Sequence, residues 1–231
     1  MTRQSLLFFV FLADSIALLI GEILFSKTLI LCTKPLLMPL LAAWLFVSTM
    51  NSLNRRLRTW WMVGLLFSTL GDTLLMFTGK SSGSSFFLMG LAAFLLAHIC
   101  YIAGIWMEAD RARGFLRKKP ALLLLGFIYL VGLLTWLWPD VPPAMRLPVA
   151  AYATVLLTMA LSVANWRNEL SNPVFQTLLA GALLFVLSDT LLAINKFGHP
   201  FSEARVAIMA TYIAGQWLMA RGVEQYINRR G

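Results

Sequence analysis

Residues 70–76 read LGDTLLM and residues 187–193 read LSDTLLA, so two closely similar segments each place an aspartate inside an apolar stretch. The chain around them is strongly apolar: 59% of its 231 residues are hydrophobic and 13% are charged. A carboxylate within a membrane-spanning helix costs about 2.5–3.5 kcal/mol on insertion scales. Asp72 and Asp189 impose that cost twice in matched surroundings, which favours a functional role over structural hydrogen bonding alone.

Apolar runs long enough to cross a membrane follow one another along the chain, and they predict an all-α integral membrane protein with eight transmembrane helices. Helices are expected because every backbone polar group must be bonded internally in lipid. The first run carries Asp14 and Glu22 and is too long for a signal-peptide core, so we expect it to be retained. The predicted spans are residues 5–25, 28–48, 60–78, 85–107, 121–138, 148–166, 174–195 and 204–222.

The basic residues predict the orientation of these spans. Thirteen of the 19 lysines and arginines fall on one side, so both termini are expected in the cytoplasm. The connections at residues 79–85 and 139–148 are short, which leaves one transmembrane domain over residues 1–231. The charge clusters lie between apolar runs and do not indicate a nucleic-acid partner; we expect a bacterial cytoplasmic membrane. The thirteen are Arg3, Arg55, Arg56, Arg58, Arg111, Arg113, Arg117, Lys118, Lys119, Arg167, Arg221, Arg229 and Arg230; Lys27, Lys80, Arg146, Lys196 and Arg205 fall on the other side.

A second repeated motif accompanies the aspartates. YIAG occurs at residues 101–104 and 212–215, each time followed two residues later by a tryptophan. The displacement is four helices, an even number, so the pattern predicts a parallel 4+4 repeat with halves at about residues 1–115 and 116–231. Such a repeat would bring the two aspartates to opposed positions facing one interior.

Several further polar residues lie within the spans. Lys34 precedes a proline that is expected to loosen its helix, and it either extends to the surface or pairs with a carboxylate. Glu22 either pairs with Lys34 or meets lipid headgroups. Asp14 lies deeper and either supports the site or serves as a packing hydrogen-bonder. Asn195 is expected to cap its helix beside the site.

His98 and Tyr101 are three residues apart and share one helix face, as do Tyr212 and Gln216 at a spacing of four. A histidine in this setting either bonds a neighbouring helix or serves the site. Cys32 and Cys100 both lie in apolar runs and are expected to be buried free thiols. The sequence contains no HExxH, GxSxG, P-loop or CxxC pattern, so we expect no metal and no cofactor.

Five segments together carry a family resemblance: residues 33–38 (TKPLLM), 71–76 (GDTLLM), 90–101 (GLAAFLLAHICY), 181–197 (GALLFVLSDTLLAINKF) and 212–216 (YIAGQ). They resemble the YhhN-like family of membrane proteins, whose characterised members are lysoplasmalogenases. Glu22 matches an acidic residue that commonly precedes the lysine-proline pair. Gly215 departs from the usual alanine, and residues 111–171 carry little of the signature.

The resemblance implies hydrolysis of the vinyl-ether bond of a lysoplasmalogen, releasing a fatty aldehyde and glycerophospho-ethanolamine or -choline. Acid cleavage of an enol ether requires a protonated acid and a carboxylate, as in glycoside hydrolysis. We therefore expect Asp72 and Asp189 to be the acid/base pair, with their individual roles open. Lys34 would keep one acid ionised or meet the phosphate, and His98, Tyr101 and Gln216 would hold glycerol oxygens or water.

Two alternatives from other functional classes use the same residues. Intramembrane acids, a lysine and a parallel repeat are also typical of a proton-coupled transporter of small molecules or lipids. A non-catalytic lipid-binding or scaffolding protein is the third interpretation. In every case membrane lipids are the expected surroundings.

Overall fold

The structure is a computed structural model that describes residues 2–78, 85–110 and 114–230. These residues form helices and no strand. The predicted loop residues 79–84, together with Arg111 and Arg113, lie outside the described residues. The helices are α1 (Arg3–Ile23), α2 (Lys27–Thr49), α3 (Arg55–Met76), α4 (Ser85–Glu108), α5 (Phe115–Lys118), α6 (Ala121–Leu137), α7 (Pro143–Asn165), α8 (Asn172–Phe197) and α9 (Ala204–Arg230), with a 3-10 turn, η2 (Trp166–Glu169), after α7.

Local sequence signals fix where these helices begin. Ser26 and Asn54 cap α2 and α3, because their side-chain oxygens accept hydrogen bonds from the backbone N–H groups three residues further on. Both α7 and α8 have a proline in the first turn, where the missing N–H costs nothing. Pro35, which was expected to loosen its helix, does not end it: α2 continues through Pro35 and Pro39 from Lys27 to Thr49.

Each of the eight predicted spans corresponds to one long helix of the described residues, but some ends were predicted wrongly. α3 begins at Arg55 and α9 continues to Arg230, because charged residues extend a helix beyond its apolar part. α7 begins at Pro143, so Pro148, which was expected to start the helix, lies inside it. The one-turn helix α5 and the turn η2 were not predicted.

Five helices of the described residues are long and apolar enough to cross a membrane: α1, α2, α4, α7 (with η2) and α8. α6 is also apolar, but its 17 residues make it shorter than these five helices. The protein is therefore a multi-pass membrane protein. Cys32 is exposed on α2 and Cys100 is buried on α4, so the expectation of two buried thiols is wrong for Cys32.

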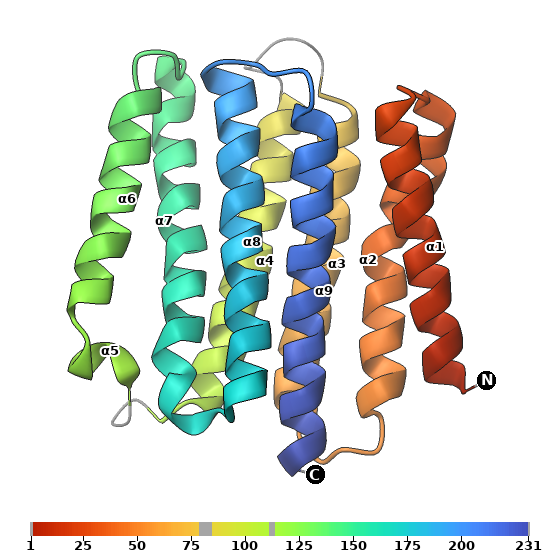
Figure 1. Ribbon diagram of the computed structural model, residues 1–231. Coiled ribbons are helices and arrows are strands. Elements are labelled where there is room, and N and C mark those ends of the chain that lie inside the picture. The colour runs from red at the N-terminus through yellow and green to blue at the C-terminus, as the bar shows by residue number, and fades with distance from the viewer. Residues whose placement is uncertain (1, 79–84, 111–113, 231) are drawn as a thin grey trace.

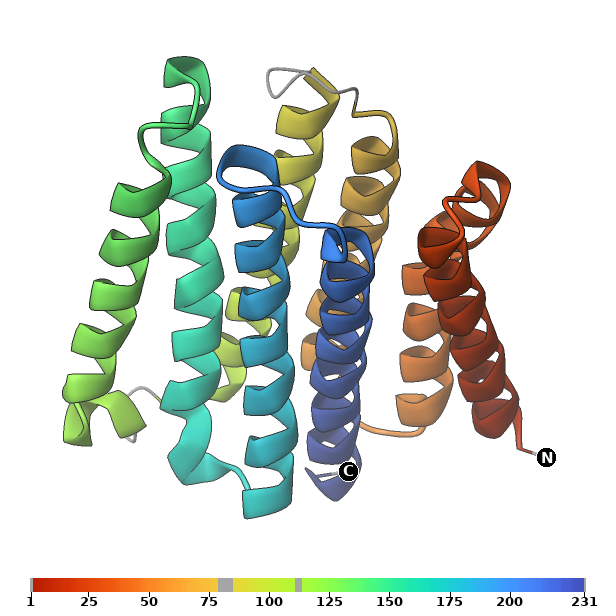
Figure 2. The same cartoon turned by 45° about the horizontal axis from the view of Figure 1, so that its top comes forward.

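The helices form a bundle in which α3 and α4 lie behind α8 and α9 (Figure 1). α1 and α6 occupy opposite sides of this bundle, as the turned view also shows (Figure 2). α8 and α9 approach closely at glycines: a Cβ on Gly181 would lie 2.6 Å from the backbone nitrogen of Met219. Both chain ends lie toward the same end of the bundle (Figure 1).

Candidate active site

Asp72 and Asp189 line one interior cavity of about 230 Å³. Asp72 comes from the last third of α3 and Asp189 from the second half of α8, and the two carboxyl groups interact electrostatically. The matched segments therefore meet at one site, although 117 positions separate their aspartates in the sequence. The remaining lining residues are Lys34, Leu75, Thr78, Phe87, Phe94, Ser188, Leu192, Asn195, Lys196, Ile208, Met209 and Tyr212.

Each aspartate accepts a hydrogen bond from a buried tyrosine on another helix. The hydroxyl of Tyr212 donates to Oδ2 of Asp72 at 2.7 Å, and the hydroxyl of Tyr152 donates to Oδ2 of Asp189. Asp72 is only 3% exposed, so this bond fixes a carboxyl that is almost entirely buried in the protein. Among the described residues, nothing donates a hydrogen bond to Oδ1 of either aspartate, which leaves that oxygen available to a ligand or to water.

Tyr152 was not among the predicted site residues. It lies in α7, within the stretch that carries little family signature, and it contacts the site only because α7 packs beside α8. The one signal available was a lone tyrosine in an apolar run, PVAAYATVLL at residues 148–157. A buried tyrosine needs a partner for its hydroxyl, but the sequence does not say which residue that partner is.

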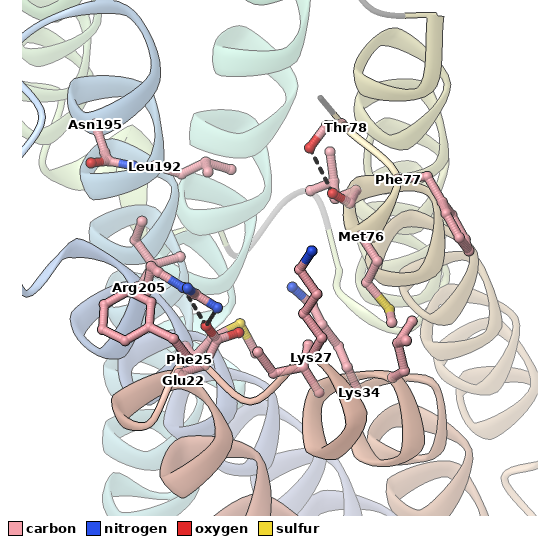
Figure 3. Close-up of a pocket in the computed structure, with 15 residues that line it drawn as sticks. Glu22, Phe25, Lys27, Lys34, Met76, Phe77, Thr78, Leu192, Asn195 and Arg205 are labelled. Carbon is pink, nitrogen blue, oxygen red and sulfur yellow. Dashed lines mark hydrogen bonds and ion pairs between the residues drawn. The ribbon is translucent and has the colours of Figure 1, made fainter. Parts of the chain in front are cut away.

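The inner cavity continues into a wider mouth of about 750 Å³ at the end of the bundle away from the chain ends. Lys34 lines both cavities, and Lys27 lines the mouth. Figure 3 shows the two ammonium groups reaching toward the middle of this mouth. Lys34 also interacts electrostatically with Asp72. Neither lysine has an ion pair within 4.0 Å in the described ranges, so both charges are open to an anion.

Glu22 at the mouth pairs with Arg205, a partner that was not predicted. The Nε and Nη2 atoms of Arg205 each lie 2.7 Å from Oε2 of Glu22, so the pair joins α1 to α9 (Figure 3). Of the two alternatives given for Glu22, pairing with Lys34 or contact with lipid headgroups, the first is not what the structure shows, because the carboxylate is held by Arg205. This ion pair leaves Lys34 free of a competing carboxylate on the α1 side.

Asn195 lines both the mouth and the inner cavity from the last turn of α8. The cap role expected for it is wrong, because α8 continues to Phe197 and Gly198 occupies the cap position. Asn195 thus lies beside the site, as expected, but presents its amide to the cavity region.

Tyr101 and Gln216 form a buried polar network next to the cavity without lining it. The Tyr101 hydroxyl donates to Oε1 of Gln216 at 3.1 Å, and Nε2 of Gln216 donates to Oγ of Ser68 at 3.1 Å. The network ties α3, α4 and α9 together. Because Gln216 lies one helical turn from Tyr212, the same contacts help to position the tyrosine that bonds Asp72.

His98 and Asp14 also lie outside the cavity lining. Nδ1 of His98 donates to the backbone carbonyl of Phe94 at 2.6 Å, while Nε2 is buried without a hydrogen-bond partner among the described residues. The imidazole packs edge-on against the ring of Tyr152, with centroids 5.6 Å apart. Asp14 lies on α1, and its Oδ2 is buried with no hydrogen-bond donor from the described part of the chain.

The fold and the cavity define a multi-pass helical membrane protein with a paired-carboxyl site. The chain belongs to the YhhN family, whose model matches residues 29–223. It is 37% identical over 164 residues to the lysoplasmalogenase TMEM86B of Sus scrofa, covering 70% of this chain and 62% of that protein.

Two further relatives carry the same activity in their names. A lysoplasmalogenase of Mycobacterium bovis is 31% identical over 168 residues, covering 72% of this chain and 61% of that protein. The lysoplasmalogenase TMEM86A of Homo sapiens is 30% identical over 206 residues, covering 84% of this chain and 76% of that protein. The match to the Sus scrofa protein covers less than two thirds of that protein's length. No solved structure matches this chain.

Proposed function

We propose that this protein hydrolyses the vinyl-ether bond of lysoplasmalogens, yielding a fatty aldehyde and a glycerophospho-ethanolamine or -choline. The observation that carries the proposal is the pair of aspartates lining one cavity, each with one oxygen that accepts no hydrogen bond from the described residues. The relatives named as lysoplasmalogenases support cleavage of the same bond. They are enzymes by name, so the comparisons give no support to a transporter.

The chemistry requires the two carboxyls to act in opposite protonation states. A carboxylic acid protonates the β-carbon of the enol ether. The ether oxygen then stabilises the resulting cation on the adjacent carbon as an oxocarbenium ion. The second aspartate, as a carboxylate, stabilises this cation and takes a proton from the attacking water. The hemiacetal that forms then collapses to aldehyde and alcohol. Glycoside hydrolases handle a related cation with two carboxyl groups.

We assign the substrate phosphate to the mouth of the cavity. Lys27 and Lys34 present two cationic groups there, and ammonium groups bind phosphate as point charges. The phosphate of a lysolipid is separated from its vinyl ether by the glycerol, and Lys34 lines both the mouth and the acidic cavity. A phosphate at Lys34 would therefore place the ether between the aspartates.

We infer that all eight long helices cross the membrane and that both chain ends are cytoplasmic, in a single domain over residues 1–231. α3 and α9 run through the same bundle as the five apolar candidates, which supports their crossing (Figure 1). The pairing of α3 with α4 and of α8 with α9 supports a parallel repeat with halves 1–115 and 116–231. A bacterial cytoplasmic membrane would suit the excess of basic residues on one side.

The test is direct. Purified protein in detergent is given an alkenyl lysophospholipid, and aldehyde release is followed. We expect turnover by the wild type and losses of about 10²–10⁴-fold in Asp72→Asn and Asp189→Asn, the usual size of an acid–base contribution. Folded wild-type protein that releases no aldehyde from any vinyl-ether lipid would contradict the proposal. Substrate flux into vesicles without chemical change would support transport instead.

A further inference from the structure

Two small apolar cavities lie beside Asp189, which lines both of them. Each holds about 50 Å³; one lies between α3, α4, α7 and α8, and the other between α6, α7 and α8. Asp189, Tyr152, Val149 and Ala193 line both, and Asp72 lines neither. The surroundings of the two aspartates therefore differ: Asp72 lies near cationic side chains, and Asp189 borders hydrocarbon.

The polarity along these neighbouring cavities, which share Asp189 or other lining residues, follows the order of groups in a single-chain phospholipid. The mouth carries Lys27 and Lys34, the inner cavity carries the two carboxyls, and the side cavities carry mainly leucine and other apolar side chains. A lysoplasmalogen presents phosphate, then glycerol with its vinyl ether, then a hydrocarbon chain. With the phosphate at the mouth, the chain must leave the inner cavity on the Asp189 side.

We propose that the hydrocarbon chain of the substrate lies in the apolar pocket between α6, α7 and α8 and continues into the bilayer beside α6; this rests on the function proposed above. The alternative pocket between α3, α4, α7 and α8 is walled by the buried rings of Phe87, Phe94 and Phe197. α6, in contrast, buries only Leu137 and exposes most of its length. At about 50 Å³ the pocket has room for about two water volumes, so it holds only the first carbons of the chain.

This placement assigns the roles of the two acids. The β-carbon of the vinyl ether is the second carbon of the chain, one bond further from glycerol than the carbon that carries the oxygen, so it lies on the Asp189 side. The carboxyl proton of Asp189 goes to that carbon, whose new C–H bond uses the C=C electron pair, while the ether oxygen shares its lone pair with the adjacent carbon. Water adds to that carbon and loses its proton to the Asp72 carboxylate. Collapse of the hemiacetal then passes its hydroxyl proton to the Asp189 carboxylate and breaks the carbon–oxygen bond to glycerol. The glycerol oxygen takes the proton that Asp72 received, so both acids return to their starting states.

The experiment compares two substitutions on α7. Ala153 lines only the pocket between α6, α7 and α8, whereas Ala151 is exposed and lines none of the cavities described. We expect Ala153→Phe to lower kcat/KM at least tenfold for a 16-carbon alkenyl substrate. The loss should be less than twofold for a 2-carbon (ethenyl) substrate, whose two carbons are the reacting ones and leave the pocket empty. Ala151→Phe should leave both values unchanged. An equal loss for both chain lengths in Ala153→Phe would overturn the proposed chain site.

A second measurement needs neither a variant nor turnover. An alkyl-ether lysophospholipid with a diazirine at the end of its chain is irradiated with wild-type protein, and the modified peptides are identified by mass spectrometry. We expect labels on α6 and the facing part of α7; labels confined to α1 and α2 would overturn the proposal. Labels on α6 together with no hydrolysis of vinyl ethers would uphold the chain site and overturn the proposed function.

Discussion

At the scale of single residues, the two tyrosines that bond the aspartates should affect the reaction rate without being proton donors to substrate. Hydrogen bonds to charged groups contribute about 1.5–3 kcal/mol. We therefore expect Tyr212→Phe and Tyr152→Phe each to lower kcat by about 10–100-fold with little change in KM. Steady-state kinetics on purified protein measures this.

The network formed by Tyr101, Gln216 and Ser68 supplies the control for this prediction. Tyr101→Phe removes a buried hydroxyl that lies outside the cavity lining, so its effect on kcat should be smaller than that of Tyr212→Phe. Equal losses in both variants would show that the hydroxyls serve packing and not the positioning of the carboxyls.

The cationic mouth gives a separate residue-scale prediction about substrate binding. Lys27→Gln and Lys34→Gln each remove one charge that faces the proposed phosphate site, and we expect KM to rise by about tenfold in each, which corresponds to about 1.4 kcal/mol. Lys119→Gln, an exposed lysine at the other end of the bundle, is the matched control and should leave KM unchanged. A substrate analogue without phosphate should be insensitive to the mouth variants, and an equal rise for that analogue would contradict phosphate recognition.

At the scale of helices, the close approach of α8 and α9 places Tyr212 against the site. A Cβ at Gly181 would lie 2.6 Å from the Met219 nitrogen and 2.9 Å from the Gly215 carbonyl oxygen, both backbone atoms that cannot move aside easily. Gly181→Ala should therefore cost about 1–3 kcal/mol through overpacking. Thermal unfolding in detergent should show a lower Tm, and activity should fall because α9 carries Tyr212.

Gly132 on α6 is the control for that helix contact. A Cβ there would meet nothing within 4 Å, so Gly132→Ala should leave the Tm unchanged or raise it slightly. If Gly181→Ala were as stable as the wild type, the α8–α9 contact would be looser than described.

The element scale also shows what the sequence could predict. The helices were predictable because apolar length alone selects a membrane-spanning helix, and Asp72 and Asp189 were predictable because a carboxyl is conspicuous in an apolar run. The partner of Asp189 was not, because Tyr152 reaches it only through the lateral packing of α7 on α8. The Glu22–Arg205 pair joins residues 183 positions apart, and no local pattern indicates such a pairing.

At the scale of the whole molecule, the cavities form a path through a bundle whose outer helices differ. On one side the Glu22–Arg205 pair ties α1 to α9 beside the cationic mouth. On the other side α6 touches the bundle through a hydrogen bond between Tyr129 and Thr190, next in sequence to Asp189. In the proposed arrangement the polar route would end at the membrane surface and the apolar route in the lipid, which would suit a substrate that stays partly in the bilayer during hydrolysis.

The orientation of this path across the membrane is the last prediction. The mouth lies at the end of the bundle away from the chain ends, so cytoplasmic termini imply a mouth that opens on the opposite side (Figure 1). Cys32 and Cys100 are first replaced by serine, and Lys27→Cys or Asn51→Cys is then introduced alone. Lys27 lies at the mouth, and Asn51 lies in the loop between α2 and α3, so the two cysteines report opposite ends of the bundle. In intact cells a membrane-impermeant maleimide should label Lys27→Cys at once and Asn51→Cys only after permeabilisation. The reverse pattern would place the mouth in the cytoplasm, and the basic residues around the chain ends would then face outward against the positive-inside rule.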